Sequence, residues 1–149
     1  MRKTAFLLGR IIFGGFFIYN GIHHLTEHET LSQYAGAKQV PAPDLAVKAT
    51  GAAMIAGGAS ILLGVKPKLG VMAIAGFLAG VSPLMHDFWT QENSEQRMSE
   101  MINFSKNMAL LGAALAMLGI EEPWPASVAT GDRGILEKAR NAARRAIAA

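Results

Sequence analysis

The sequence predicts an all-α protein, a four-helix transmembrane bundle with a C-terminal amphipathic tail helix. Three features support this prediction: four apolar segments of nearly equal length, an uneven distribution of basic residues over the connections, and helical spacing of apolar residues in a basic tail. The four segments are residues 4–24, 45–65, 69–86 and 102–120. Each is close to the ~20 residues that cross the hydrocarbon core of a bilayer as a helix.

The second and third segments give the strongest signal, because residues 49–65 and 69–85 contain no charged side chain. The first segment contains Arg10 and the fourth contains Lys106, so their uncharged stretches are shorter. We expect Arg10 to snorkel to the interface or to pair inside the bundle. Segments of this length also fit a soluble bundle, and the mean hydropathy of +0.27 is modest. Their Gly, Ala and Met content and their lack of polar faces favour the membrane.

The basic residues gather on one side of the predicted bundle. Ten of the fourteen lie near the N-terminus, between the second and third segments, or in the tail: Arg2, Lys3, Arg10, Lys66, Lys68, Arg133, Lys138, Arg140, Arg144 and Arg145. The positive-inside rule therefore predicts a multi-pass membrane protein with both termini in the cytoplasm. The pI near 9.5 reflects this anchoring charge, and no basic face interleaved with aromatics indicates nucleic-acid binding.

We divide the chain into a four-span domain, residues 1–122, and a cytoplasmic basic tail, residues 123–149. The first span is expected to be retained, because no signal-peptide cleavage site follows it. Trp124 is expected at the membrane interface, and residues 135–149 are expected to form an amphipathic helix on the anionic leaflet or a partner-binding tail.

The chain has no cysteine, which excludes disulfides, thiolate metal sites and a cysteine nucleophile.

Pairs of small residues predict close helix packing. Gly76 and Gly80 form such a pair in the third span, and Ala53 and Gly57 form one in the second. Spacings of this kind let helix backbones approach closely. They also favour self-association or binding of a membrane partner.

Polar and aromatic side chains cluster at the span ends that the topology places on the outer face. The candidate ligand-binding residues are Asn20, His23, His24, His86, Asp87, Trp89, Asn103, Lys106 and Asn107. Because polar groups are costly at the edge of hydrocarbon, we expect them to form one paired site. Asp87 is expected to pair with Lys106 or Lys48.

Three interpretations of this cluster stay open. It can be purely structural, capping helices and fixing the bundle. It can be a quinone pocket, since a quinone carbonyl needs a donor such as His or Lys and its reduction needs a proton relay such as His with Asp. It can be a metal site, for which the candidates are His23, His24, His28 and His86. No catalytic residue is assigned, and quinone is the only cofactor suggested.

The chain resembles the DoxX family of small four-helix membrane proteins from Arg10 to Ile120. The resemblance rests on Gly21, on Val-Pro-Ala-Pro at 40–43, on the glycine-bounded stretch 57–64, and on the clusters at 86–89 and 103–107. It implies a four-helix integral membrane fold and a link to redox chemistry. Some relatives resemble membrane subunits of thiosulfate:quinone oxidoreductase, and others are associated with complexes containing superoxide dismutase and a sulfurtransferase.

The resulting hypothesis is a quinone-linked or redox-associated membrane subunit with its site at the outer face. Its expected partners are the lipid bilayer, oxidoreductase subunits or other membrane-associated enzymes, and further copies of itself. The main alternative is a non-catalytic scaffold that organises partner enzymes, and whether the chain is itself an enzyme stays open. A small-solute carrier is least favoured, because no span is interrupted near its middle by a proline and polar motif.

Overall fold

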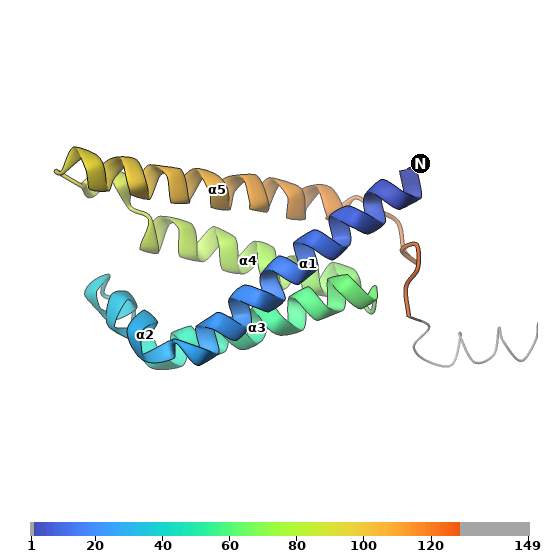
Figure 1. Ribbon diagram of the computed structural model, residues 1–149, viewed down its shortest axis with the longest axis horizontal. Helices are drawn as coiled ribbons and strands as arrows, with labels where there is room; N and C mark the ends of the chain where they lie inside the picture. The colour runs from blue at the N-terminus through green and yellow to red at the C-terminus, as the bar shows by residue number, and fades with distance from the viewer. Residues whose placement is uncertain (1, 129–149) are drawn as a thin grey trace, which may run out of the picture.

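The computed structural model describes residues 2–128 of the 149-residue chain, and this part is all-helical (Figure 1). The elements are α1 (Arg2–Thr26), α2 (His28–Ala37), α3 (Pro43–Leu63), α4 (Pro67–Met85), the 3₁₀ helix η1 (Phe88–Thr90) and α5 (Ser94–Leu118). By length and composition, α1, α3, α4 and α5 can each cross a membrane. The predicted four-span fold is confirmed, and the predicted tail helix at 135–149 lies outside the described residues.

Local signals explain where the spanning helices begin and end. Pro43 and Pro67 stand in the first turns of α3 and α4, where the fixed φ of proline suits a helix and its missing N–H leaves no intrahelical bond unmade. Asn93 caps α5 by accepting backbone N–H bonds from Glu95 and Gln96 at 2.9 and 3.0 Å. This cap makes α5 begin well before the apolar segment that predicted it.

The short helix α2 was not predicted from the sequence. The chain continues from α1 through Glu27 into α2, which packs against α3 and has Ala35 buried. In Figure 1 α2 lies at the end of the bundle opposite the N-terminus. We call this end, which also carries η1, the α2 end.

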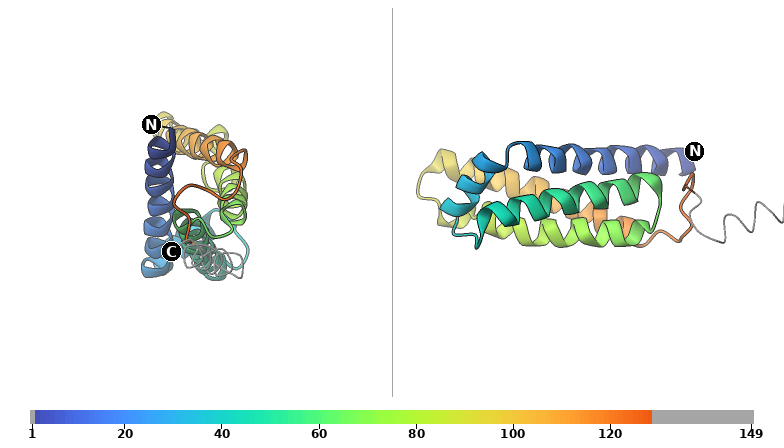
Figure 2. Two further views of the ribbon diagram at one scale, coloured as in Figure 1. Left: turned by 90° about the vertical axis from the view of Figure 1, so that its right-hand side faces the viewer. Right: turned by 90° about the horizontal axis from the view of Figure 1, so that it is seen from below.

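The spanning helices pack in the order α1, α3, α4, α5 around the bundle (Figure 2). Close approaches between glycines of neighbouring helices set this arrangement, and two of them are the tightest. A Cβ on Gly58 of α3 would lie 2.6 Å from the carbonyl oxygen of Gly14 of α1, and one on Gly70 of α4 would lie 2.6 Å from that of Gly57 of α3. From the second approach, α3 and α4 diverge toward the α2 end (Figure 1).

The small-residue prediction is therefore right for Gly57 and wrong for Gly76 and Gly80. A Cβ at either of the latter two would meet no atom within 4 Å. Both glycines are exposed, and they lie where α4 has diverged from α3. The spacing of small residues therefore shows that a helix can be approached closely by another helix. The spacing does not show which face of the helix makes that close contact.

The segment after α5 folds back onto the bundle end that carries the N-terminus. Trp124 is 2% exposed and packs edge-on against Phe6, with ring centroids 5.2 Å apart. Arg10 is also 2% exposed, and its Nη1 and Nη2 donate to the carbonyl oxygens of Pro125 and Ala126 at 2.8 and 3.1 Å. Arg10 thus pairs inside the bundle, and Trp124 is buried against the bundle end, while its predicted position at the membrane interface stays a prediction.

Candidate functional site

A cavity of about 550 Å³ lies among the helices in the half of the bundle nearest the α2 end. Each of the helices α1 to α5 contributes to its wall. The apolar part of the lining includes Phe16, Phe17, Met54, Phe77 and Leu78. The volume lies within the range of sites that hold small organic molecules.

A few polar side chains interrupt this apolar wall. Asn20 and His24 come from α1, Thr50 from α3, His86 from the end of α4 and Asn107 from α5. Thr50 Oγ1 lies 3.4 Å from His24 Nδ1. An apolar cavity with a small number of convergent polar groups is typical of a site that orients one ligand.

The cavity gathers four of the nine predicted site residues: Asn20, His24, His86 and Asn107. The others lie elsewhere. His23 and Lys106 are exposed, Trp89 is 54% exposed, Asn103 is half-buried outside the cavity lining, and Asp87 belongs to a separate ion pair. Helix geometry explains the division, because neighbours along a helix point about 100° apart, so that His24 lines the cavity while His23 does not.

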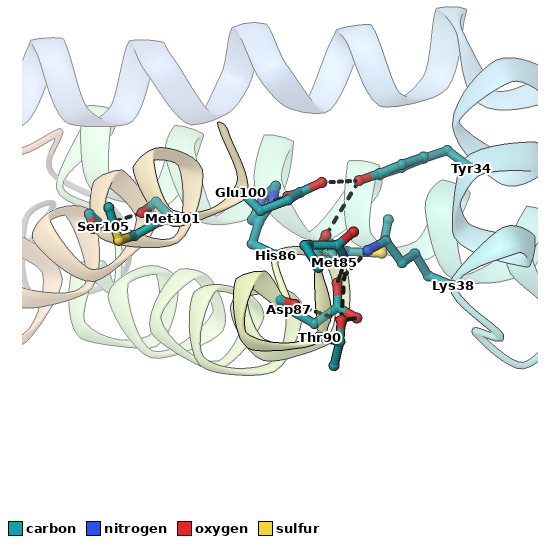
Figure 3. Close-up of polar contacts among 10 residues, drawn as sticks. Tyr34, Lys38, Met85, His86, Asp87, Thr90, Glu100, Met101 and Ser105 are labelled. Atoms are coloured by element: carbon teal, nitrogen blue, oxygen red, sulfur yellow. Dashed lines mark hydrogen bonds and ion pairs between the residues drawn. The ribbon is translucent and has the colours of Figure 1, made fainter. Parts of the chain in front are cut away.

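Two side chains of the cavity wall, Tyr34 and His86, form a polar network with Glu100 at the α2 end (Figure 3). His86 Nδ1 lies 2.8 Å from Oε2 of Glu100, whose side chain comes from α5. The Tyr34 hydroxyl, from α2, lies 3.2 Å from Glu100 Oε1 and 3.3 Å from the carbonyl oxygen of Met85. Burial, and then the nearby negative charge of Glu100, raises the pKa of Tyr34.

A second contact joins α2 to the end of α4. Lys38 forms an ion pair with Asp87, which also accepts a hydrogen bond from Thr90 Oγ1 at 2.8 Å (Figure 3). The hydrogen bond to Asp87 raises the pKa of Lys38. The expected pairing of Asp87 with Lys106 or Lys48 is wrong, because α2 brings Lys38 to Asp87.

Sequence reasoning missed Tyr34, Lys38, Thr50 and Glu100. Tyr34 lies in α2 and Lys38 just after it, and this helix was not predicted from the sequence. Glu100 precedes the predicted fourth segment, residues 102–120, and was not among the candidate residues. Its signal was its position one or two helical turns from Asn103 and Asn107, which a helix starting at Asn93 would have revealed.

The four histidines considered for a metal do not come together. His28 Nδ1 lies 3.0 Å from Asp44, His86 contacts Glu100, His24 lines the cavity and His23 is exposed. Among residues 2–128, no three His, Asp or Glu side chains form a cluster able to hold a metal ion.

The comparisons with known proteins identify the family. The family model named DoxX matches residues 5–87, which is more than half of the chain and runs from α1 through α4. No curated protein and no solved structure matches the chain. Together with four helices able to span a membrane, the match establishes that this chain is a multi-pass membrane protein of the DoxX family.

Proposed function

We propose that the protein is a quinone-linked or redox-associated subunit of the cell inner membrane, and that the cavity binds the quinone ring. The observation that carries this proposal is the cavity itself, an apolar space of about 550 Å³ with Asn20, His24, Thr50, His86 and Asn107 in its wall. Its aromatic side chains suit a flat ring, and its polar groups suit the two ring carbonyls.

The proposed roles follow from the position of each group. His24 and Asn107 can donate hydrogen bonds to the ring oxygens, because both line the cavity. His86 also lines it and contacts Glu100, so these two side chains can pass a proton between the ring and the α2 end. The electrons come from a partner oxidoreductase in this proposal.

The proposed orientation places both termini in the cytoplasm and the α2 end at the outer face. Lys66 lies in the connection between α3 and α4 and Lys68 in the first turn of α4, at the end opposite α2, where the N-terminus of α1 also lies (Figure 1). Basic residues are retained on the cytoplasmic side of membrane proteins. The quinone ring then binds in the outer half of the bilayer.

A binding measurement on matched histidine variants tests this proposal. Purified protein is reconstituted in liposomes and titrated with a short-chain quinone. We expect His24→Leu to weaken binding about tenfold through the lost hydrogen bond. His23→Leu changes the same residue type on an exposed position and is expected to bind like the wild type. Absence of quinone binding by the wild type, or an equal loss in both variants, contradicts the proposal.

The alternative is a non-catalytic scaffold, and one observation favours it. Much of α5 is exposed, including the large apolar side chains of Met98, Met101, Ile102 and Leu115. Such a surface can face lipid, a second copy or a partner enzyme. The scaffold predicts partner enzymes that co-purify in equal amounts with the wild type and with His24→Leu, and that are lost when residues 129–149 are deleted.

A further inference from the structure

The cavity is covered at both of its ends along the bundle axis. At the α2 end, α2 is attached to α4 and α5 by the Tyr34 contacts and by the Lys38–Asp87 ion pair. Toward the other end, α3 and α4 meet at Gly57 and Gly70 so closely that no side chain fits between their backbones. A ligand in the cavity can therefore extend along neither direction without moving these contacts.

Part of the cavity wall reaches the outside of the bundle on α4, at the level where α4 has diverged from α3 (Figure 1). Gly76 and Gly80 line the cavity from α4, and both are also exposed on the outside of the bundle. A Cβ at either position would meet no atom within 4 Å. From α1, Phe16 also lines the cavity and is 45% exposed.

We infer that the ligand of this cavity carries a long apolar tail, and that the tail leaves the bundle between α3 and α4 across Gly76 and Gly80. This inference rests on the proposed binding of a quinone ring. A space of about 550 Å³ encloses a ring and a short substituent, so a long hydrocarbon tail extends beyond it. The two glycines lie within the membrane-spanning part of α4, where a tail that emerges enters the hydrocarbon of the bilayer.

The same opening explains why glycine stands at these positions although neither makes a close helix contact. A larger side chain at Gly76 or Gly80 would fit sterically but would occupy the opening. Leucine is also a better helix former than glycine, so a Gly→Leu substitution here is expected to leave the fold intact. Gly112 of α5 offers a matched control, because a Cβ there also meets open space and the residue does not line the cavity.

The test compares a quinone without a side chain and a decyl-substituted quinone of the same ring, each titrated against reconstituted wild type, Gly76→Leu, Gly80→Leu and Gly112→Leu. We expect Gly76→Leu and Gly80→Leu to weaken binding of the decyl quinone about tenfold, because leucine overfills the path of the tail. The same variants bind the unsubstituted quinone as the wild type does. Gly112→Leu binds both quinones like the wild type.

The outcomes separate this inference from the one on which it rests. Equal effects of Gly80→Leu on both quinones, or no effect on either, overturn the tail path while leaving ring binding in place. A wild type that binds neither quinone overturns both. Circular dichroism and thermal unfolding of each variant in the same liposomes show that a selective loss arises in a folded protein.

Discussion

Arg10 brings a cation into a membrane-spanning helix and still satisfies most of its donors. Its two terminal nitrogens bind the carbonyl oxygens of Pro125 and Ala126, and within residues 2–128 only Nε lacks an acceptor. Guanidinium donors suit this task, because they form a planar fork that reaches two acceptors at once. Arg10 therefore fixes the segment after α5 against the bundle.

Arg10→Ala is expected to release this segment. The loss of two charge-assisted hydrogen bonds weakens its attachment by about 2 kcal/mol. In a Trp89→Phe background Trp124 is the only tryptophan of the chain, so its fluorescence reports the release as a shift to longer wavelength. Lys3→Ala, which removes an exposed charge of the same helix, is the control. An unchanged Trp124 emission in Arg10→Ala contradicts the role assigned to Arg10.

The attachment of α2 is expected to depend on pH. The pKa of Lys38 is raised by Asp87, so the ion pair stabilises the fold below the ordinary lysine pKa of 10.5 and is lost as pH rises through the higher folded value. The pKa of Tyr34 is raised by burial and Glu100, so ionisation above its ordinary value of 10.0 also disfavours the docked helix. Both groups therefore keep α2 docked at neutral pH and weaken it above pH 10.

A nitroxide attached through a maleimide to Ala37→Cys can follow this transition by electron paramagnetic resonance. We expect a restricted label at neutral pH and a mobile label above the pKa values of free lysine and tyrosine. Addition of Tyr34→Phe and Lys38→Met should make the label mobile at every pH. A spectrum that stays restricted through the alkaline range would show that other contacts hold α2.

Among the elements, α1 and α3 depend most directly on glycine. A Cβ on Gly58 would lie 2.6 Å from a backbone oxygen and 3.1 Å from the backbone nitrogen of Ile18, and neither atom can move without shifting α1. Gly58→Ala is expected to lower the free energy of unfolding by about 2 kcal/mol, since the helices must separate. Gly112→Ala should leave it nearly unchanged. Denaturation in mixed micelles measures both, and equal stabilities would contradict the close approach.

The sequence predicts the spanning helices well and their connections poorly. Long uncharged runs such as residues 69–85 specify a helix by themselves, because the bilayer leaves the backbone no other way to satisfy its hydrogen bonds. The ten-residue α2 has no such signal, and its short polar sequence is ordered by contacts with α3, α4 and α5. Because α2 was not predicted, Lys38 was not considered as a partner of Asp87, and the predicted pairing was wrong.

The candidate site was predicted only in part, because the sequence does not show how the helices are rotated against one another. Spacing placed Asn20 and His24 on one face of α1, and both line the cavity. Which neighbouring residue points inward depends on how α1 is rotated against α3, and that rotation is fixed by Gly14 and Gly58. A list of polar residues at the span ends therefore included His23 and Lys106, which the packing leaves outside.

For the molecule as a whole, the proposed orientation gives a direct labelling prediction. The natural chain has no cysteine, so a single introduced cysteine is the only thiol. Glu92→Cys, just before α5, should react with a membrane-impermeant maleimide in intact cells or spheroplasts. Lys68→Cys, at the start of α4, should react only after the membrane is opened. The reverse pattern would place the α2 end in the cytoplasm.

The central claim is that a quinone occupies the cavity, and photoaffinity labelling with a photoreactive quinone in native membranes tests it most directly. Mass spectrometry of the labelled protein is expected to locate adducts on cavity residues such as Phe17, Met54 and Phe77. Labelling should be strongly reduced in His24→Leu and unchanged in His23→Leu. Adducts spread over lipid-facing side chains such as Ile12 and Leu115, unchanged by His24→Leu, would contradict it.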